Sequence, residues 1–179
     1  MARSLKVPLF MQPAGKPYCG PTSIRMLLSF YGVGVSLKSL VNLLPMTSDG
    51  IDLYSMGIFL KSFGDVALFI DENSKNGKEP IYKYTIPMFK GMEGLFISSA
   101  IRTSDIRKSL AMGYPVILNI ESLHRPGRGH YVVVKNIGKK RITINDPSYG
   151  QRILSIKRIM KSCHGWSGGA IILFPSLPT

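Results

Sequence analysis

Three side chains of the sequence could together carry out nucleophilic catalysis: Cys19, His130 and Asp146. Cys19 stands directly before a Gly-Pro pair and an apolar helical pattern, so we expect it at a helix N-terminus. Unpaired backbone N–H groups and the helix dipole favour negative charge there, and we expect the pKa of the thiol to fall from its usual value of about 8.5 toward neutrality. The thiolate would then be a nucleophile. On position alone, a small buried apolar cysteine is the alternative interpretation.

Residues 130–147, HYVVVKNIGKKRITINDP, contain two β-type runs around a Gly-containing turn, which is typical of an antiparallel hairpin. If the hairpin is symmetric about Gly138, His130 lies opposite Asp146 with Cβ atoms about 4.5 to 5.5 Å apart. The carboxylate would fix the imidazole tautomer, so that the other ring nitrogen could accept a proton from a thiol. The alternative is an exposed histidine and an aspartate that initiates a turn before Pro147. A bulge would shift the register by one residue and turn one of the two groups to the other face. Apart from His130 and Asp146, the face that carries them is predicted to be apolar, with Val132, Val134, Ile142 and Ile144.

Gln12 is a candidate for stabilising negative charge in the reaction. It precedes Cys19 by seven residues, and its side-chain amide could join the backbone N–H of Cys19 in donating to an oxyanion. Taken alone, a glutamine in the sequence MQPAG is typical of a polar loop. Its functional interpretation therefore depends on the other three residues.

The remaining chemically interesting residues carry weaker signals. Cys163 and His164 are adjacent, which is poor spacing for chelation, and the structural interpretation is favoured for them. Trp166, the only tryptophan, either shields the histidine–aspartate pair from water or belongs to the core. His124 lies in the loop LHRPGRGH, and most loops of this kind are solvated. Arg125 and Arg128 of this loop could instead line the rim of a cleft and favour acidic substrates.

The elements that must position these residues change in type along the chain. Apolar side chains at helical spacing predict helices over residues 21–31, 36–44 and 52–63, and a short helix capped by Ser104 that ends before Gly113. A polar loop is expected over residues 71–80. Strands are predicted over residues 66–70, 115–120, 130–136, 141–146 and 169–174. Helices early and strands late indicate an α+β fold with an antiparallel sheet, in a single domain over residues 1–179 whose helical lobe covers about 1–65 and whose β-rich lobe covers about 66–179.

The composition limits the class of protein. Lys and Arg number 23 against 10 Asp and Glu, so the formal charge is +13, which would attract nucleic acid, anionic lipid or acidic peptides. No zinc-finger spacing, RNA-binding aromatic motif or basic heptad accompanies the charge, and nucleic acid is therefore not favoured as the main partner. We read no secretory signal and no apolar stretch of about 18 residues, and expect a cytoplasmic protein without a transmembrane segment. Two cysteines require no oxidising compartment. The sequence does not indicate an oligomeric state.

Three segments resemble the papain-like cysteine peptidases of the bacteriocin-processing type: VPLFMQPAGKPYCGPTSIRMLLSFYG, DIRKSLAMGYPVILNI and GHYVVVKNIGKKRITINDPSYG. The best-known members of this family cleave double-glycine leader peptides. The resemblance covers nearly the whole chain and implies a papain-like fold, with Gln12 as oxyanion donor, Cys19 as nucleophile, His130 as general base and acid, and Asp146 as its orienter. It implies no metal or organic cofactor. Because the transmembrane and ATPase segments of the transporter-linked members are absent, we expect a standalone member and leave its substrate open.

The sequence thus predicts a cysteine peptidase that acts on a peptide or protein substrate through a thioester acyl-enzyme. Three alternatives remain at this point. The same groups could catalyse deamidation or transpeptidation. The scaffold could be a non-catalytic basic module that binds nucleic acid or acidic protein. Finally, Cys19, His130 and Asp146 could form a metal site.

Overall fold

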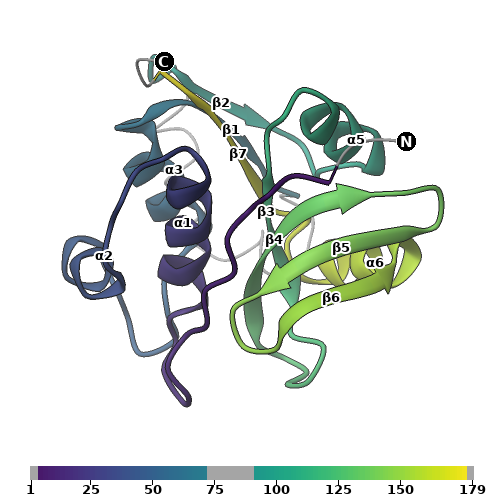
Figure 1. Cartoon of the computed structure of the whole chain (residues 1–179), viewed down its shortest axis with the longest axis horizontal. Helices are drawn as coiled ribbons and strands as arrows, with labels where there is room; N and C mark the ends of the chain where they lie inside the picture. The colour runs from purple at the N-terminus through teal and green to yellow at the C-terminus, as the bar shows by residue number, and fades with distance from the viewer. Residues whose placement is uncertain (1–3, 72–90, 177–179) are drawn as a thin grey trace.

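Three helices form in the first half of the chain where apolar spacing predicts them. The computed structural model describes residues 4–71 and 91–176 (Figure 1). The helices are α1 (Cys19–Phe30), α2 (Leu37–Leu43) and α3 (Leu53–Lys61), and the last two begin after the side-chain caps Ser36 and Asp52. Helix α1 begins two residues earlier than we expected. Pro21 is still in its first turn, where a missing N–H costs no intrahelical hydrogen bond.

The strands of the described residues form one mixed sheet in the order β2-β1-β7-β3-β4-β5-β6. Five of its six neighbouring pairs are antiparallel, as predicted, and β1 with β2 is parallel. The predicted α+β class with a mainly antiparallel sheet is confirmed, whereas the division into lobes near residue 65 stays a prediction. The bounds of the strands are β1 Gly64–Phe69, β2 Leu95–Ser98, β3 Val116–Glu121, β4 Gly129–Ile137, β5 Arg141–Asp146, β6 Gly150–Ser155 and β7 Ala170–Pro175.

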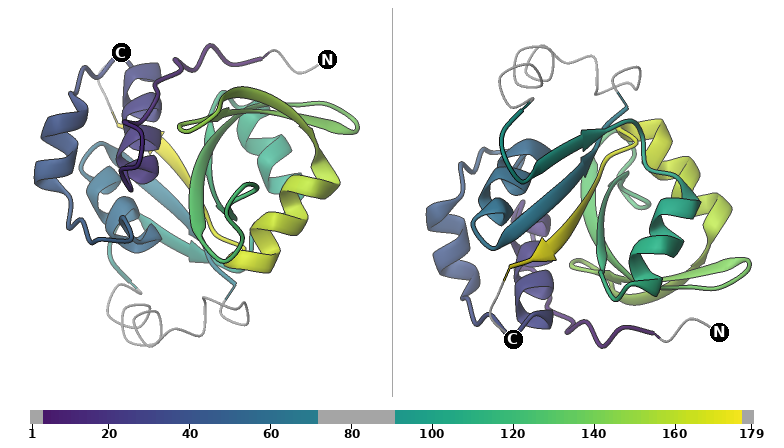
Figure 2. Two further views of the ribbon diagram at one scale, coloured as in Figure 1. Left: turned by 90° about the horizontal axis from the view of Figure 1, so that it is seen from below. Right: turned by 90° about the horizontal axis from the view of Figure 1, so that it is seen from above.

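Helices cover both faces of this sheet and create two separate hydrophobic cores. One core packs α1, α2 and α3 against one face, and Tyr131 and Val133 of β4 belong to it. The other core packs α5 (Thr103–Ala111) and α6 (Ile156–Trp166) against the opposite face, to which Val132 and Val134 contribute. Figure 2 shows the sheet curling around α5 and α6 while α1 lies outside the curl. Successive side chains of β4 therefore belong alternately to the two cores, because each face of the strand packs against a different layer of helices.

The register of the β4–β5 hairpin differs from the one we expected. Val134 pairs with Ile144 instead of Ile142, because the turn is centred between Lys139 and Lys140 and not on Gly138. Near the turn, Ile137 pairs with Ile142, and this register alone would turn Asp146 to the face opposite His130. A bulge between Val134 and Asn136 shifts the pairing back by one residue toward the expected register. The predicted apolar face is therefore preserved, and Asp146 lies diagonally across from His130 instead of directly opposite.

The sequence patterns missed several elements of the second half. Strands β2 and β6 and helix α6 were not predicted, although Ser155 caps α6 and three buried residues at helical spacing mark its inner side, Ile159, Met160 and Cys163. The expected cap Ser104 is wrong: α5 begins at Thr103, and the carboxylate of Asp105 accepts the N–H of Arg102 at 2.9 Å. Most of the polar loop expected over 71–80 lies outside the described residues. Within residues 4–71 and 91–176, no helix has the length and apolar character needed to cross a membrane.

Candidate active site

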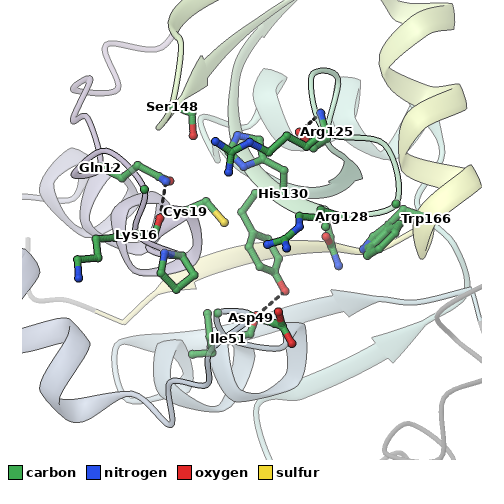
Figure 3. A pocket seen from close by; sticks show the side chains of 18 of the residues that line it. Gln12, Lys16, Cys19, Asp49, Ile51, Arg125, Arg128, His130, Ser148 and Trp166 are labelled. Carbon is green, nitrogen blue, oxygen red and sulfur yellow. Dashed lines mark hydrogen bonds between the residues drawn. The ribbon is translucent and has the colours of Figure 1, made fainter.

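Cys19 lies at the N-terminus of α1, as the sequence predicts, and is its first residue. The preceding residue, Tyr18, provides no side-chain cap, so the N–H groups of the first turn are not capped by a side chain. The thiol is half-buried and lines a cavity of about 850 Å³ that lies between the start of α1 and the start of β4. Figure 3 shows the sulfur directed toward the ring of His130. Cys19 thus packs partly against the core and also lines the cavity.

His130 and Asp146 form a buried hydrogen-bonded pair. The distance from His130 Nε2 to Asp146 Oδ1 is 2.8 Å, and the exposed fractions of the two residues are 8% and 2%. Asp146 Oδ1 also accepts the backbone N–H of Ser148 at 2.9 Å. Because Nε2 is occupied by the carboxylate, Nδ1 is the ring nitrogen that remains for proton exchange with Cys19, which lines the same cavity. Two segments more than a hundred residues apart in sequence thus converge on one imidazole.

The electrostatics of the pair favour a charged ring. Burial lowers the pKa of His130, but hydrogen bonds to Asp146 and Cys19, together with the charges of both, outweigh it and raise the pKa to about 9. Burial raises the pKa of Asp146, yet the hydrogen bond and charge of His130, the N–H of Ser148 and the Arg152 guanidinium hold it below its ordinary value. The site therefore stabilises an imidazolium beside a carboxylate at neutral pH.

Gln12 lines the same cavity as Cys19 and His130. Its Nε2 donates to the carbonyl of Lys16 at 2.7 Å, and its backbone N–H donates to the carbonyl of Pro147 at 2.9 Å. A primary amide has two N–H donors, so the bond to Lys16 orients the group and leaves one donor for a ligand in the cavity. In Figure 3 this side chain lies beside Cys19. All four predicted site residues are thus brought together.

The wall of the cavity opposite α1 is basic and aromatic. Arg125 and Arg128 line it, which agrees with the alternative in which they form a cleft rim, and Asp49 lies at the lower side in the view of Figure 3. Trp166 is half-buried and lies against Gly129, where an added Cβ would be 2.8 Å from the indole Nε1. Trp166 therefore belongs to the cavity wall and packs against Gly129, the residue that precedes the catalytic candidate His130.

The second cysteine belongs to the core. Cys163 is completely buried, its sulfur lies 3.6 Å from the carbonyl oxygen of Gly169, and burial raises the pKa of its thiol to about 12. The adjacent His164 is exposed, so the two side chains do not share an environment. Across the described part of the chain, no three His, Cys, Asp or Glu side chains converge as ligands of a metal ion would. The structural interpretation of Cys163 is confirmed.

One cluster near the site was missed because β6 was missed. Arg152 pairs with Ile144 on β5, and its Nη1 lies 3.8 Å from Asp146 Oδ2. The same Nη1 is hydrogen-bonded to His124 Nε2 at 2.8 Å, and the His124 ring packs on Tyr149 with a centroid distance of 4.0 Å. The alternating pattern of residues 150–155 was the available signal, since it turns Arg152 toward the face that carries Asp146.

Comparisons with known proteins agree with this geometry. The model of the peptidase C39 like family matches residues 4–163. A double glycine motif protease from an AMS/PCAT transporter, solved in complex with its leader peptide, is similar in structure, with a TM-score of 0.64, 20% identity, and coverage of 97% of this chain and 94% of that one. A putative C39-like peptidase from Bacillus anthracis has a TM-score of 0.68 and 14% identity, and the match covers 97% of this chain and 96% of that one. The peptidase domain of Streptococcus ComA, a bifunctional ABC transporter of a quorum-sensing pathway, has a TM-score of 0.61 and 19% identity, and the match covers 95% of this chain and 99% of that one.

No curated protein matches the chain by sequence. The family match nevertheless extends over most of the chain and includes the segments that carry Gln12, Cys19, His130 and Asp146. The chain therefore belongs to the peptidase C39 like family and is a papain-like cysteine peptidase.

Proposed function

We propose that the protein hydrolyses peptide bonds with Cys19 as nucleophile, His130 as general acid and base, and Asp146 as the group that orients the ring. The observation that carries the proposal is the buried imidazole of His130, which is hydrogen-bonded to the Asp146 carboxylate and lines the same cavity as the Cys19 thiol. No other cysteine among the described residues has a histidine partner, since Cys163 is buried beside a carbonyl oxygen.

The reaction divides into acylation and deacylation. The Cys19 thiolate attacks the carbonyl carbon of the scissile bond, the C–N bond breaks, and His130 gives its proton to the leaving amine. A thioester joins the acyl half of the substrate to Cys19. Water then attacks this thioester, its proton passes to His130, and the C–S bond breaks to release a carboxylic acid and the thiolate. Asp146 keeps Nε2 engaged throughout, so Nδ1 remains the nitrogen that exchanges the proton.

The developing oxyanion of each step requires hydrogen-bond donors. The backbone N–H of Cys19 at the start of α1 and the second amide N–H of Gln12 are the donors that the cavity offers beside the sulfur. Both lie on the wall formed by the α1 side, while His130 comes from the sheet. A peptide in the cavity would thus lie between the two walls.

The basic rim supports a preference for acidic substrates. Lys16, Arg125 and Arg128 line the cavity, and the chain carries a formal charge of +13. We propose that these groups attract a peptide with acidic residues near the scissile bond. Replacing Arg125 and Arg128 by alanine should raise KM for an acidic peptide several-fold and leave a neutral peptide nearly unaffected. Equal changes for both peptides would contradict an electrostatic role.

The test of the chemistry uses a diverse peptide mixture that includes double-glycine leader peptides and is analysed by mass spectrometry. The wild-type protein should generate new peptide termini. Cys19→Ala and His130→Ala should generate none, and Cys163→Ala is the matched control that should stay active. Mass changes of side-chain amides without cleavage would favour deamidation, joined peptides would favour transpeptidation, and unchanged peptides that remain bound would favour a binding module. Turnover by Cys19→Ala would exclude the proposed nucleophile.

A further inference from the structure

The segment that carries Gln12 is held by strand β5 through one buried side chain. Asn145 is completely buried, and its Nδ2 donates to the carbonyl of Val7 at 3.0 Å and to the carbonyl of Pro8 at 3.2 Å. The oxygen of the same amide is buried without a partner among the described residues. Burying an acceptor without a hydrogen-bond partner lowers the stability of the fold. The two hydrogen bonds that Nδ2 of Asn145 donates offset this loss.

Two backbone hydrogen bonds complete the attachment of residues 4–12, which we call the N-terminal strap. The N–H of Leu5 donates to the carbonyl of Lys135 at 3.0 Å, and the N–H of Gln12 donates to the carbonyl of Pro147 at 2.9 Å. The bonds of Asn145 lie between these two points. The strap is therefore fixed to β4, β5 and the residue that follows β5, and Figure 1 shows it crossing the front of the molecule from the sheet toward α1.

Apolar packing gives the second half of the strap little support of its own. Leu9 and Met11 are 43% and 50% exposed, so neither anchors the chain in a core. Phe10 is half-buried, packs against the core of α1, α2 and α3, and lies under the guanidinium of Arg25, which is 4.0 Å from the ring centroid. Phe10 is thus the apolar anchor of this half of the strap, and the polar attachment to the sheet fixes the backbone on either side of it.

We propose that Asn145 is a positioning residue for Gln12, so that adjacent residues of one strand hold the two polar halves of the active site. Successive side chains of a strand point to opposite faces. Asp146 orients the His130 ring on one face, and Asn145 fixes the strap on the other. This inference rests on the proposed function, in which Gln12 donates to the oxyanion. It makes β5 the element that couples the base to the oxyanion donor.

The inference separates two reactions of Cys19. Alkylation by iodoacetamide requires the thiolate and its imidazolium partner but forms no oxyanion, whereas peptide hydrolysis requires both. Loss of the Asn145 bonds should therefore lower kcat for hydrolysis and leave the alkylation rate of Cys19 unchanged. A merely structural role of Asn145 would lower both rates together.

The experiment compares Asn145→Ala, Gln12→Ala and the double variant, with Thr143→Ala as the matched control on the same face of β5. Gln12→Ala should lower kcat by about 10²- to 10³-fold, the usual loss for one oxyanion donor. Asn145→Ala should lower kcat by about 10- to 100-fold through misplacement of the donor, with a smaller change of KM. The double variant should be no slower than Gln12→Ala alone, because the strap then has no donor to position. Thr143→Ala should match the wild type.

Two results would overturn the role of Asn145: multiplicative losses in the double variant, or a parallel fall of alkylation and hydrolysis in a variant that remains folded by circular dichroism. If Asn145→Ala does not fold, Asn145→Ser, which keeps one donor, replaces it in the same cycle. The Cys19→Ala protein distinguishes failure of the proposed function from failure of the positioning role of Asn145. Its retained turnover would refute the proposed function, whereas an inactive Cys19→Ala protein with multiplicative losses at residues 12 and 145 would refute only the positioning role.

Discussion

Replacing Asp146 by asparagine tests the central electrostatic element of the site. The rise of the His130 pKa from 6.5 to about 9 corresponds to about 3 kcal/mol of preference for the charged ring, since one pKa unit is about 1.4 kcal/mol. Burial opposes this preference, so the hydrogen bonds and charges of Asp146 and Cys19 must supply it. If the carboxylate supplies about half, its removal costs about 1.5 kcal/mol and lowers the population of the imidazolium–thiolate pair about tenfold.

The assay is the pH dependence of two rates. In the wild type, kcat/KM should fall above about pH 9, where the imidazolium is lost. In Asp146→Asn this limb should move to lower pH, alkylation of Cys19 at pH 6 to 7 should slow about tenfold, and kcat should fall by about 10²- to 10⁴-fold because the ring also loses its orienting acceptor. Asp49→Asn removes another carboxylate that lines the cavity and is the matched control. An Asp146→Asn protein that keeps the wild-type limb and alkylation rate would refute this explanation of the His130 charge.

The same pair makes folding stability depend on pH. His130 has a raised pKa in the folded state, so its contribution is complete below pH 6.5 and is lost as the pH rises through about 9. Asp146 has a lowered pKa, so its contribution is present above pH 3.8 and is lost as the pH falls through the folded-state value. We expect the free energy of unfolding in urea to fall by up to about 3 kcal/mol between pH 6.5 and 9.5. The Asp146→Asn protein should lose about half of this dependence, and a curve parallel to that of the wild type would contradict the assignment of the His130 charge to Asp146.

Two further outcomes can be measured on simple variants or on the native chain. Iodoacetamide at pH 6 to 7 should label Cys19 at least about 100-fold faster than Cys163, because the Cys163 thiol is completely buried and has a pKa of about 12. The two labelling rates can be measured by peptide mapping with mass spectrometry. Equal rates would contradict an activated thiol at Cys19. Gly129→Ala should destabilise the protein by about 1 to 3 kcal/mol in thermal unfolding, since its Cβ would lie 2.8 Å from the Trp166 indole, whereas Gly138→Ala, with its nearest atom at 3.6 Å, should cost much less. Equal losses at the two glycines would show that contact with Trp166 is not the cause.

The amino-acid sequence by itself determined the local elements and the chemical types of the site. Helices α1, α2 and α3 follow from apolar residues at helical spacing and from the caps Ser36 and Asp52, which act within one or two turns of chain. The two faces of the β4–β5 hairpin follow from strict alternation. Gln, Cys, His and Asp in this order along the chain indicated nucleophilic catalysis by a cysteine, because few other functions require these four residue types together.

Only the tertiary structure decided how the four residues meet. The β4–β5 register depends on a turn and a bulge whose geometry is selected by packing between two helical layers. A shift of the register by two residues leaves the alternation of inward and outward side chains unchanged, so the sequence pattern could not detect it. Strand β6 exists because β5 offers it an edge, so Arg152 could not be assigned to Asp146 from its own neighbours in sequence. The attachment of the N-terminal strap to Asn145 joins residues more than 130 positions apart. Contacts of this kind form when the whole chain buries its apolar surface, and no short window of sequence contains the energies that select them.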